Sequence, residues 1–179
     1  ALQNDVKRLL AYPSIENIGV IFIGLGIATL GVAASNSIVA TLALCGALLH
    51  IVNHSLFKTL LFFGAGNLYS QMHSTHLNSF GGVAKSMPVT AILFLIATAA
   101  ICALPPLNGF VGEFMIYLGM LNSVRDGVNV LYAAGGMLAL SLIGGIVVLA
   151  FTKLYSTVFL GSPRHHHVAE SEEVDSLRI

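Results

Sequence analysis

An apolar run at residues 37–69 is the feature that most constrains the fold of this chain. About 20 apolar residues cross the hydrocarbon core of a bilayer, so a run of this length predicts a membrane-spanning helix. His50, His54 and Lys58 interrupt the run at four-residue steps. Each step turns a helix by about 40° net, which places the three side chains in one stripe roughly 80° wide and about 12 Å long. A lysine at this depth costs roughly 2.5–3.5 kcal/mol, so we expect the stripe to face a protein interior or a wet cavity.

The composition places the whole chain in the same class. Hydrophobic residues make up 56% of the sequence and charged residues 9%, and the mean hydropathy is +0.86. Since charged residues make up about a quarter of a typical soluble domain, the chain is predicted to be an integral membrane protein. The 8 basic residues balance the 8 acidic residues, which argues against a nucleic-acid partner bound through phosphate contacts.

Four apolar stretches predict an all-α, polytopic transmembrane helix bundle with about four membrane helices. They cover residues 15–34, 37–69, 88–121 and 128–160. Pro13 stands just before the first stretch, where proline favours a helix start. Glu16 and Asn17 are expected at that start, where an acid complements the helix dipole. We expect residues 1–164 to form one transmembrane domain, and residues 165–179 to form a polar cytoplasmic tail.

The third stretch is broken between Leu104 and Gly109. Pro105 and Pro106 each lack a backbone donor, and Gly109 favours a further local break. Interrupted membrane helices are tolerated where the loosened backbone lines a cavity, and transporters place ion sites at such breaks. Glu113 follows the break and is therefore a candidate proton-carrying group. The alternative is a proline kink at which Glu113 packs against the lysine of the second stretch.

The stripe on the second helix has more than one explanation. A buried lysine poised between its charged and neutral forms can accept and release a proton. Histidines titrate near neutrality, which suits a relay through intervening water. Alternatively, Lys58 is paired with a carboxylate that holds helices together, and His50 and His54 are packed core residues. The spacing of the two histidines could also hold a metal ion, but no third ligand stands at a compatible spacing, so neither a metal site nor a haem site is predicted.

Basic residues predict the orientation of the chain in the membrane. Lys7, Arg8, Lys85 and Arg164 share one side of a topology with four crossings, whereas Arg125 lies on the other side. Cytoplasmic loops carry an excess of Lys and Arg. The termini and the connection between the second and third stretches are therefore predicted to be cytoplasmic.

Three motifs together resemble the antiporter-like membrane subunits shared by respiratory complex I, Mrp-type cation/proton antiporters and energy-converting hydrogenases. The motifs are residues 5–12, the ladder of His50, His54 and Lys58, and residues 104–113. Within this family, residues 14–19 and 104–110 look most like hydrogenase-4 component B and the corresponding formate hydrogenlyase subunit. Residues 110–114 also look like the M-type subunit of bacterial complex I.

The resemblance implies a proton channel module within a larger redox-driven complex of the inner (cytoplasmic) membrane. Lys58 would be the central relay lysine, His50 and His54 its hydrated neighbours, and Glu113 the terminal carboxylate. Its partners would be other membrane subunits, a redox-active peripheral arm and the lipid bilayer. Family members have a preceding half with its own broken helix and a glutamate–lysine pair. We therefore expect this chain, which does not begin with methionine, to be the later half only.

The sequence carries no cysteine cluster, glycine-rich phosphate loop or flavin signature. No cofactor is predicted, and we expect the redox chemistry of such a complex to lie in other chains. Two further functions stay open: an Mrp-type sodium/proton antiporter that uses the same ladder, and a structural scaffold whose polar residues only fix helix packing.

Overall fold

The computed structural model describes residues 3–164, 168 and 171–173 of the chain, so the predicted tail lies largely outside the described residues. The described residues form five α-helices and two short 3-10 helices, and they contain no β-strand. In chain order the elements are α1 (Val6–Ala33), α2 (Ser37–Met72), η1 (Leu77–Ser79), η2 (Val83–Lys85), α3 (Pro88–Ile101), α4 (Asn108–Arg125) and α5 (Val130–Phe159).

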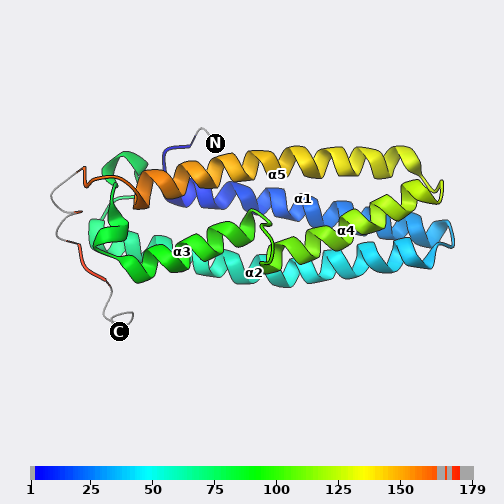
Figure 1. The fold of residues 1–179 in the computed structure, drawn as a ribbon, viewed down its shortest axis with the longest axis horizontal. Helices are drawn as coiled ribbons and strands as arrows, with labels where there is room; N and C mark the ends of the chain where they lie inside the picture. The colour runs from blue at the N-terminus through cyan, green and yellow to red at the C-terminus, as the bar shows by residue number, and fades with distance from the viewer. Residues whose placement is uncertain (1–2, 165–167, 169–170, 174–179) are drawn as a thin grey trace.

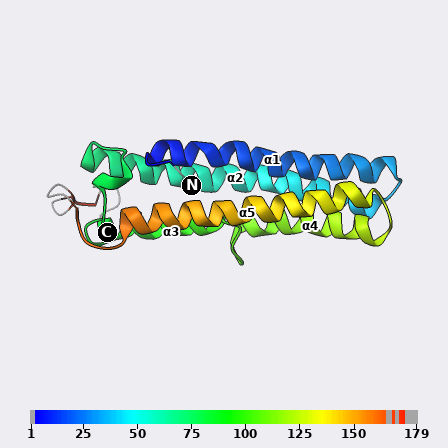
Figure 2. The same cartoon turned by 90° about the horizontal axis from the view of Figure 1, so that it is seen from above.

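The helices form an elongated bundle with two layers. α1 and α2 make one layer, and α5 lies with α3 and α4 in the other (Figure 2). α3 and α4 follow one another end to end along α2 (Figure 1). α1, α2 and α5 are long and apolar enough to cross a membrane, and α3 is a shorter apolar helix. With α3 and α4 as one interrupted crossing, the prediction of a polytopic all-α bundle with about four membrane helices is confirmed.

The first helix begins earlier than predicted, because Asp5 caps it. The Asp5 side chain accepts a hydrogen bond from the Arg8 backbone N–H at 2.9 Å, and α1 starts at Val6. The Thr75 hydroxyl also donates to Asp5, and this hydrogen bond lowers the pKa of the Asp5 carboxyl below its ordinary value. Pro13 therefore lies inside α1 rather than at its start. The prediction that Glu16 and Asn17 stand at the helix start is wrong, since they lie about three turns inside it.

The predicted break separates α3 from α4. α3 ends at Ile101 and α4 begins at Asn108, so Pro105 and Pro106 lie in the connection, and Gly109 lies in the first turn of α4. A Cβ atom on Gly109 would lie 2.0 Å from the Ala100 carbonyl oxygen. Only glycine therefore lets the first turn of α4 pass this close to the end of α3.

α2 and α4 touch through their backbones at two glycines. A Cβ atom on Gly112 would lie 3.0 Å from the Cβ atom of His50. A Cβ atom on Gly46 would lie 2.9 Å from the Gly112 carbonyl oxygen. Small residues allow such close helix contacts in membrane bundles. Glu113 directly follows Gly112, so this contact also brings Glu113 close to His50 along the bundle axis.

The buried apolar side chains form two clusters at different levels of the bundle. The first lies at the end that carries η1 and η2, and it includes Leu10, Leu61, Phe80, Phe94 and Phe151. The second lies toward the other end, and it includes Val20, Ile27, Ala43, Ile116 and Leu140. On α1, α2 and α4, the ionisable residues of the membrane segments fall between or beside these clusters.

Candidate functional site

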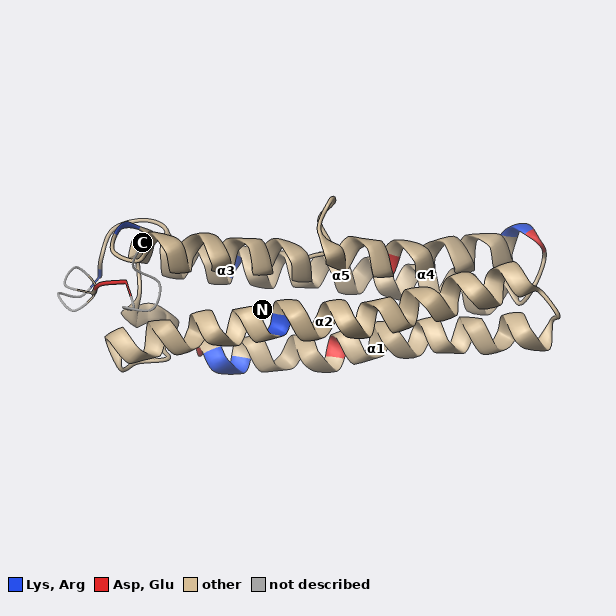
Figure 3. Cartoon of the chain, turned by 90° about the horizontal axis from the view of Figure 1, so that it is seen from below, with Lys and Arg blue, Asp and Glu red and all other residues tan. Residues whose placement is uncertain are grey.

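A layer of polar side chains, about 12 Å thick along α2, crosses the middle of the bundle from Lys58 beside the first apolar cluster to His50. We call it the polar layer, and its members are Glu16, Asn17, His50, Asn53, His54, Lys58, Asn108 and Glu113. Figure 3 shows that few other positions along the helices are charged. Since such groups are costly inside a bilayer, their concentration in this part of the bundle indicates a site rather than scattered substitutions.

The α2 stripe faces the bundle as the spacing predicts. His50 is 1% exposed and Lys58 is 7% exposed, and His54 is half-buried. The Phe57 ring packs edge-on against both histidines, with ring centroids 5.5 Å from His54 and 6.4 Å from His50. The two histidines therefore hold defined positions one turn apart on the same side of α2.

Asn17 of α1 holds the imidazole of His50. Its Oδ1 atom lies 3.0 Å from His50 Nε2, and its Nδ2 atom donates to the Pro13 carbonyl oxygen at 2.7 Å. Because the Asn17 amide donates to Pro13, it presents its oxygen to His50, and Nε2 must carry the proton of that hydrogen bond. Nδ1 of His50 is buried and has no hydrogen-bond partner among the described residues.

Lys58 is held by a neutral group rather than by a carboxylate. Its Nζ atom donates to the main-chain carbonyl of Leu10 in α1. Pro13 has no N–H to donate to the Leu9 carbonyl oxygen, so the helix is disturbed in the turn that also contains Leu10. Among the described residues, no salt bridge joins Lys58 to Glu16 or Glu113.

Glu16 and Glu113 line the same small cavity. It has a volume of about 20 Å³, and helices α1, α3, α4 and α5 and the break contribute to its walls. The polar and ionisable groups around it are Glu16, Asn17, Cys102 and Glu113. A space of this size holds about one water molecule. Oε1 of Glu16 is buried without a hydrogen-bond partner among the described residues.

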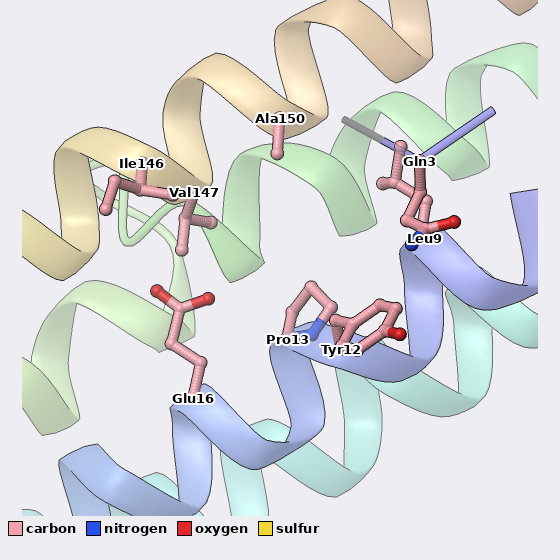
Figure 4. Close-up of a pocket in the computed structure, with 8 residues that line it drawn as sticks. All are labelled: Gln3, Leu9, Tyr12, Pro13, Glu16, Ile146, Val147 and Ala150. Carbon is pink, nitrogen blue, oxygen red and sulfur yellow. The ribbon is translucent and has the colours of Figure 1, made fainter. Parts of the chain in front are cut away.

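A second, larger cavity of about 400 Å³ lies between α1 and α5. Its lining residues are Gln3, Leu9, Tyr12, Pro13, Glu16, Ile146, Val147 and Ala150. The Glu16 carboxylate extends from α1 toward Val147 and Ile146 of α5 (Figure 4). Tyr12 is 57% exposed, so this cavity reaches the surface of the described chain.

Two asparagines attach the start of α4 to α2. Nδ2 of Asn53 donates to the Asn108 carbonyl oxygen at 2.7 Å, and Nδ2 of Asn108 donates to Asn53 Oδ1 at 3.3 Å. This pair of hydrogen bonds fixes the first turn of α4, and with it the position of Glu113. Asn53 is not among the site residues predicted from the sequence. An amide inside an apolar run, one residue before His54, could have indicated a buried hydrogen-bonding position there.

The structure places the predicted relay residues in the polar layer and adds residues from α1. His50 and Glu113 are linked through the α2–α4 contact at Gly112, and His54 and Lys58 continue along α2. Nε2 of His54 is also buried without a hydrogen-bond partner in the described part of the chain. No three His, Cys, Asp or Glu side chains of the described residues are grouped so that they could hold a metal ion.

An interrupted helix beside a buried layer of ionisable groups defines a class of polytopic membrane protein that moves charge. Residues 1–141 match the family described as "NADH:quinone oxidoreductase/Mrp antiporter, TM", and the chain belongs to this family. The resemblance drawn from the three motifs is therefore confirmed.

Relatives come from several complexes. The chain is 40% identical to hydrogenase-4 component B of Escherichia coli over 179 residues, which cover 99% of this chain and 27% of the relative. It is 41% identical to formate hydrogenlyase subunit 3 of Escherichia coli over 165 residues, 91% of this chain and 27% of the relative. It is 34% identical to NADH-quinone oxidoreductase subunit M of Rickettsia prowazekii over 159 residues, 89% of this chain and 28% of the relative. The chain thus spans little more than a quarter of the length of these relatives.

Proposed function

We propose that this chain forms a proton-conducting segment of an antiporter-like subunit in a redox-driven complex of the hydrogenase-4 or formate hydrogenlyase type. The observation that carries the proposal is that Lys58 is buried and donates a hydrogen bond to a main-chain carbonyl. A buried lysine held by a main-chain carbonyl can release its proton without breaking a salt bridge. Other membrane subunits and a redox-active peripheral arm would be its partners. The words "component" and "subunit" in the names of two relatives support an assembly of several chains.

Hydration of the polar layer supports this proposal. Nδ1 of His50, Nε2 of His54 and Oε1 of Glu16 are all buried and lack partners among the described residues. Buried polar atoms are normally satisfied by water where protein groups do not reach them. Water at these atoms would connect the histidines with Lys58 along α2 and with the carboxylates of α1 and α4. Protons then pass between neighbouring groups through short water bridges.

Lys58, His50, His54 and Glu113 take separate roles in this proposal. Lys58 stores and releases the proton at the centre of the path. His50 and His54 pass it along α2, because each has a buried nitrogen without a hydrogen-bond partner among the described residues. Glu113 takes it up beside the break, where the α3–α4 connection interrupts the apolar barrier.

We also propose that the protein lies in the inner membrane with both termini in the cytoplasm. α1 starts, and α5 ends, at the end of the bundle that carries η1 and η2 (Figure 1). Lys7, Arg8, Lys85 and Arg164 belong to this end, whereas Arg125 belongs to the opposite turn between α4 and α5. The excess of basic residues favours the cytoplasm for the first end.

The test replaces Lys58 in the full-length parent subunit within its complex. In reconstituted vesicles, Lys58→Ala is expected to abolish proton pumping that is driven by the redox substrate, while the complex still assembles. Lys85→Ala is the matched control, because Lys85 is an exposed lysine of η2 outside the polar layer. Normal pumping by Lys58→Ala would refute the proposal. Proton flux that needs sodium and no redox substrate would instead identify a sodium/proton exchanger.

A further inference from the structure

We infer that Glu16 of α1 is an additional proton-carrying group, placed where the cavity between α1 and α5 meets the small cavity beside Glu113. This inference rests on the proposed function, because it adds a station and an access route to the same path. The relay predicted from the sequence contained His50, His54, Lys58 and Glu113, and it did not include Glu16.

The position of Glu16 follows from the start of α1. Asp5 caps the helix at Val6, so Glu16 lies about 15 Å along the helix axis and reaches the polar layer rather than the membrane surface. A carboxylate at the helix start would be stabilised by the free N–H groups there, but Glu16 is too far inside for that role.

Glu16 lies on the wall of both cavities. Glu16 and Val147 line the larger cavity between α1 and α5, and the same two residues line the small cavity that contains Glu113. Glu16 is the ionisable residue that the two cavities share. Figure 4 shows its carboxylate directed into the space between α1 and α5, beside Val147. A proton carrier at this junction connects the two spaces without a continuous open channel.

The larger cavity supplies a route from the start of α1. On α1 it is lined by Leu9, Tyr12, Pro13 and Glu16, which follow one face of the helix for about 10 Å. Gln3 lies at the outer end of this wall, and Tyr12 is largely exposed. The route therefore starts beside Gln3, ahead of α1, and finishes at a buried carboxylate oxygen that has no partner among the described residues.

Glu16 also interacts electrostatically with both neighbouring stations. Its carboxylate attracts the ammonium group of Lys58 and repels the carboxylate of Glu113. Neither interaction is a direct salt bridge in the described part of the chain. A proton on Glu16 thus removes an attraction on one side and a repulsion on the other, so Glu16 couples the charge states of Lys58 and Glu113.

The test compares substitutions at Glu16 in the full-length parent complex, reconstituted in vesicles. Proton pumping is measured with a pH-sensitive dye, and the redox turnover is measured in parallel. Glu16→Gln keeps the shape of the side chain but cannot carry the proton, and it is expected to lower pumping by about tenfold or more. Glu16→Asp, which restores a carboxylate, is expected to recover much of the flux. Glu172→Gln, an exposed glutamate near the end of the described chain, is the matched control.

A second variant tests the junction without removing a charge. Val147→Leu narrows the space that both cavities share, and it is expected to lower pumping while all ionisable groups remain. Full pumping by both Glu16→Gln and Val147→Leu would overturn the inference. If Lys58→Ala abolishes pumping in the same preparation, the proposed function stands and only the role of Glu16 is refuted. If Lys58→Ala also pumps normally, the proposed function itself fails.

Discussion

Asn17 decides which nitrogen of His50 is available for proton transfer. Its amide is oriented by the hydrogen bond to the Pro13 carbonyl oxygen, so its oxygen faces His50 Nε2. The neutral imidazole then carries its proton on Nε2 and exposes the lone pair of Nδ1, which has no partner among the described residues. A proton carrier needs such an open nitrogen, and Asn17 positions it without exchanging protons itself.

We expect Asn17→Leu to weaken both the protein and its proton flux. The substitution leaves Nε2 of His50 buried without its acceptor, which costs about 1–3 kcal/mol of stability. The imidazole is also free to change its tautomer, so pumping should fall while redox turnover is retained. Thermal unfolding in detergent and dye-monitored pumping measure the two effects. Asn67→Leu, an amide of α2 outside the polar layer, is the control. A fully active, fully stable Asn17→Leu protein would contradict this assignment.

At the scale of single residues, the sequence pointed to the ladder on α2 and to Glu113 beside the break, and it missed residues that depend on contacts between helices. His50, His54 and Lys58 follow from their spacing on α2, because a helix fixes that geometry locally. Glu16 and Asn17 could not be placed in the same way. Their role depends on where α1 begins, and the Asp5 cap involves Thr75, which lies 70 positions away in the sequence.

At the scale of helices, the contact of α2 with α4 sets the geometry of the site. The two backbones approach at Gly46 and Gly112, and the hydrogen bonds between Asn53 and Asn108 hold the start of α4. Lipid chains are as apolar as the helix surfaces, so close packing and hydrogen bonds take over from the hydrophobic effect. The break itself was predictable from its prolines, but the partner that anchors it was not.

Gly112→Ala is expected to separate these helices. Its new Cβ atom would lie 3.0 Å from His50 Cβ and 3.1 Å from His50 Cα, and a backbone neighbour cannot move aside as a side chain can. We expect a loss of about 1–3 kcal/mol in stability and reduced pumping, since His50 and Glu113 move apart. Gly66→Ala in α2 is the matched control, because a Cβ atom there meets nothing within 4 Å. Equal stability of the two variants, measured by thermal unfolding in detergent, would show that the contact is not tight.

At the scale of the whole molecule, two apolar clusters enclose the polar layer and keep it away from both ends of the bundle. The cluster with η1 and η2 closes one end, and the cluster around Ile116 and Leu140 closes the other. Proton access must therefore follow cavities along the helices, such as the one between α1 and α5. The number of crossings was predictable from hydropathy, whereas this arrangement depends on which faces of distant helices meet.

The orientation of the whole bundle yields a test by labelling from either side of the membrane. Single cysteines are introduced by Lys85→Cys and by Arg125→Cys, after Cys45 and Cys102 have been replaced by alanine. Lys85 and Arg125 belong to opposite ends of the bundle. If the excess of basic residues sets the orientation, a membrane-impermeant thiol reagent labels Lys85→Cys in inside-out vesicles and Arg125→Cys in right-side-out vesicles. Permeabilised membranes, in which both positions react, provide the control for accessibility. The reverse pattern would place the termini outside the cytoplasm, and the cavity between α1 and α5 would then lead to the opposite compartment.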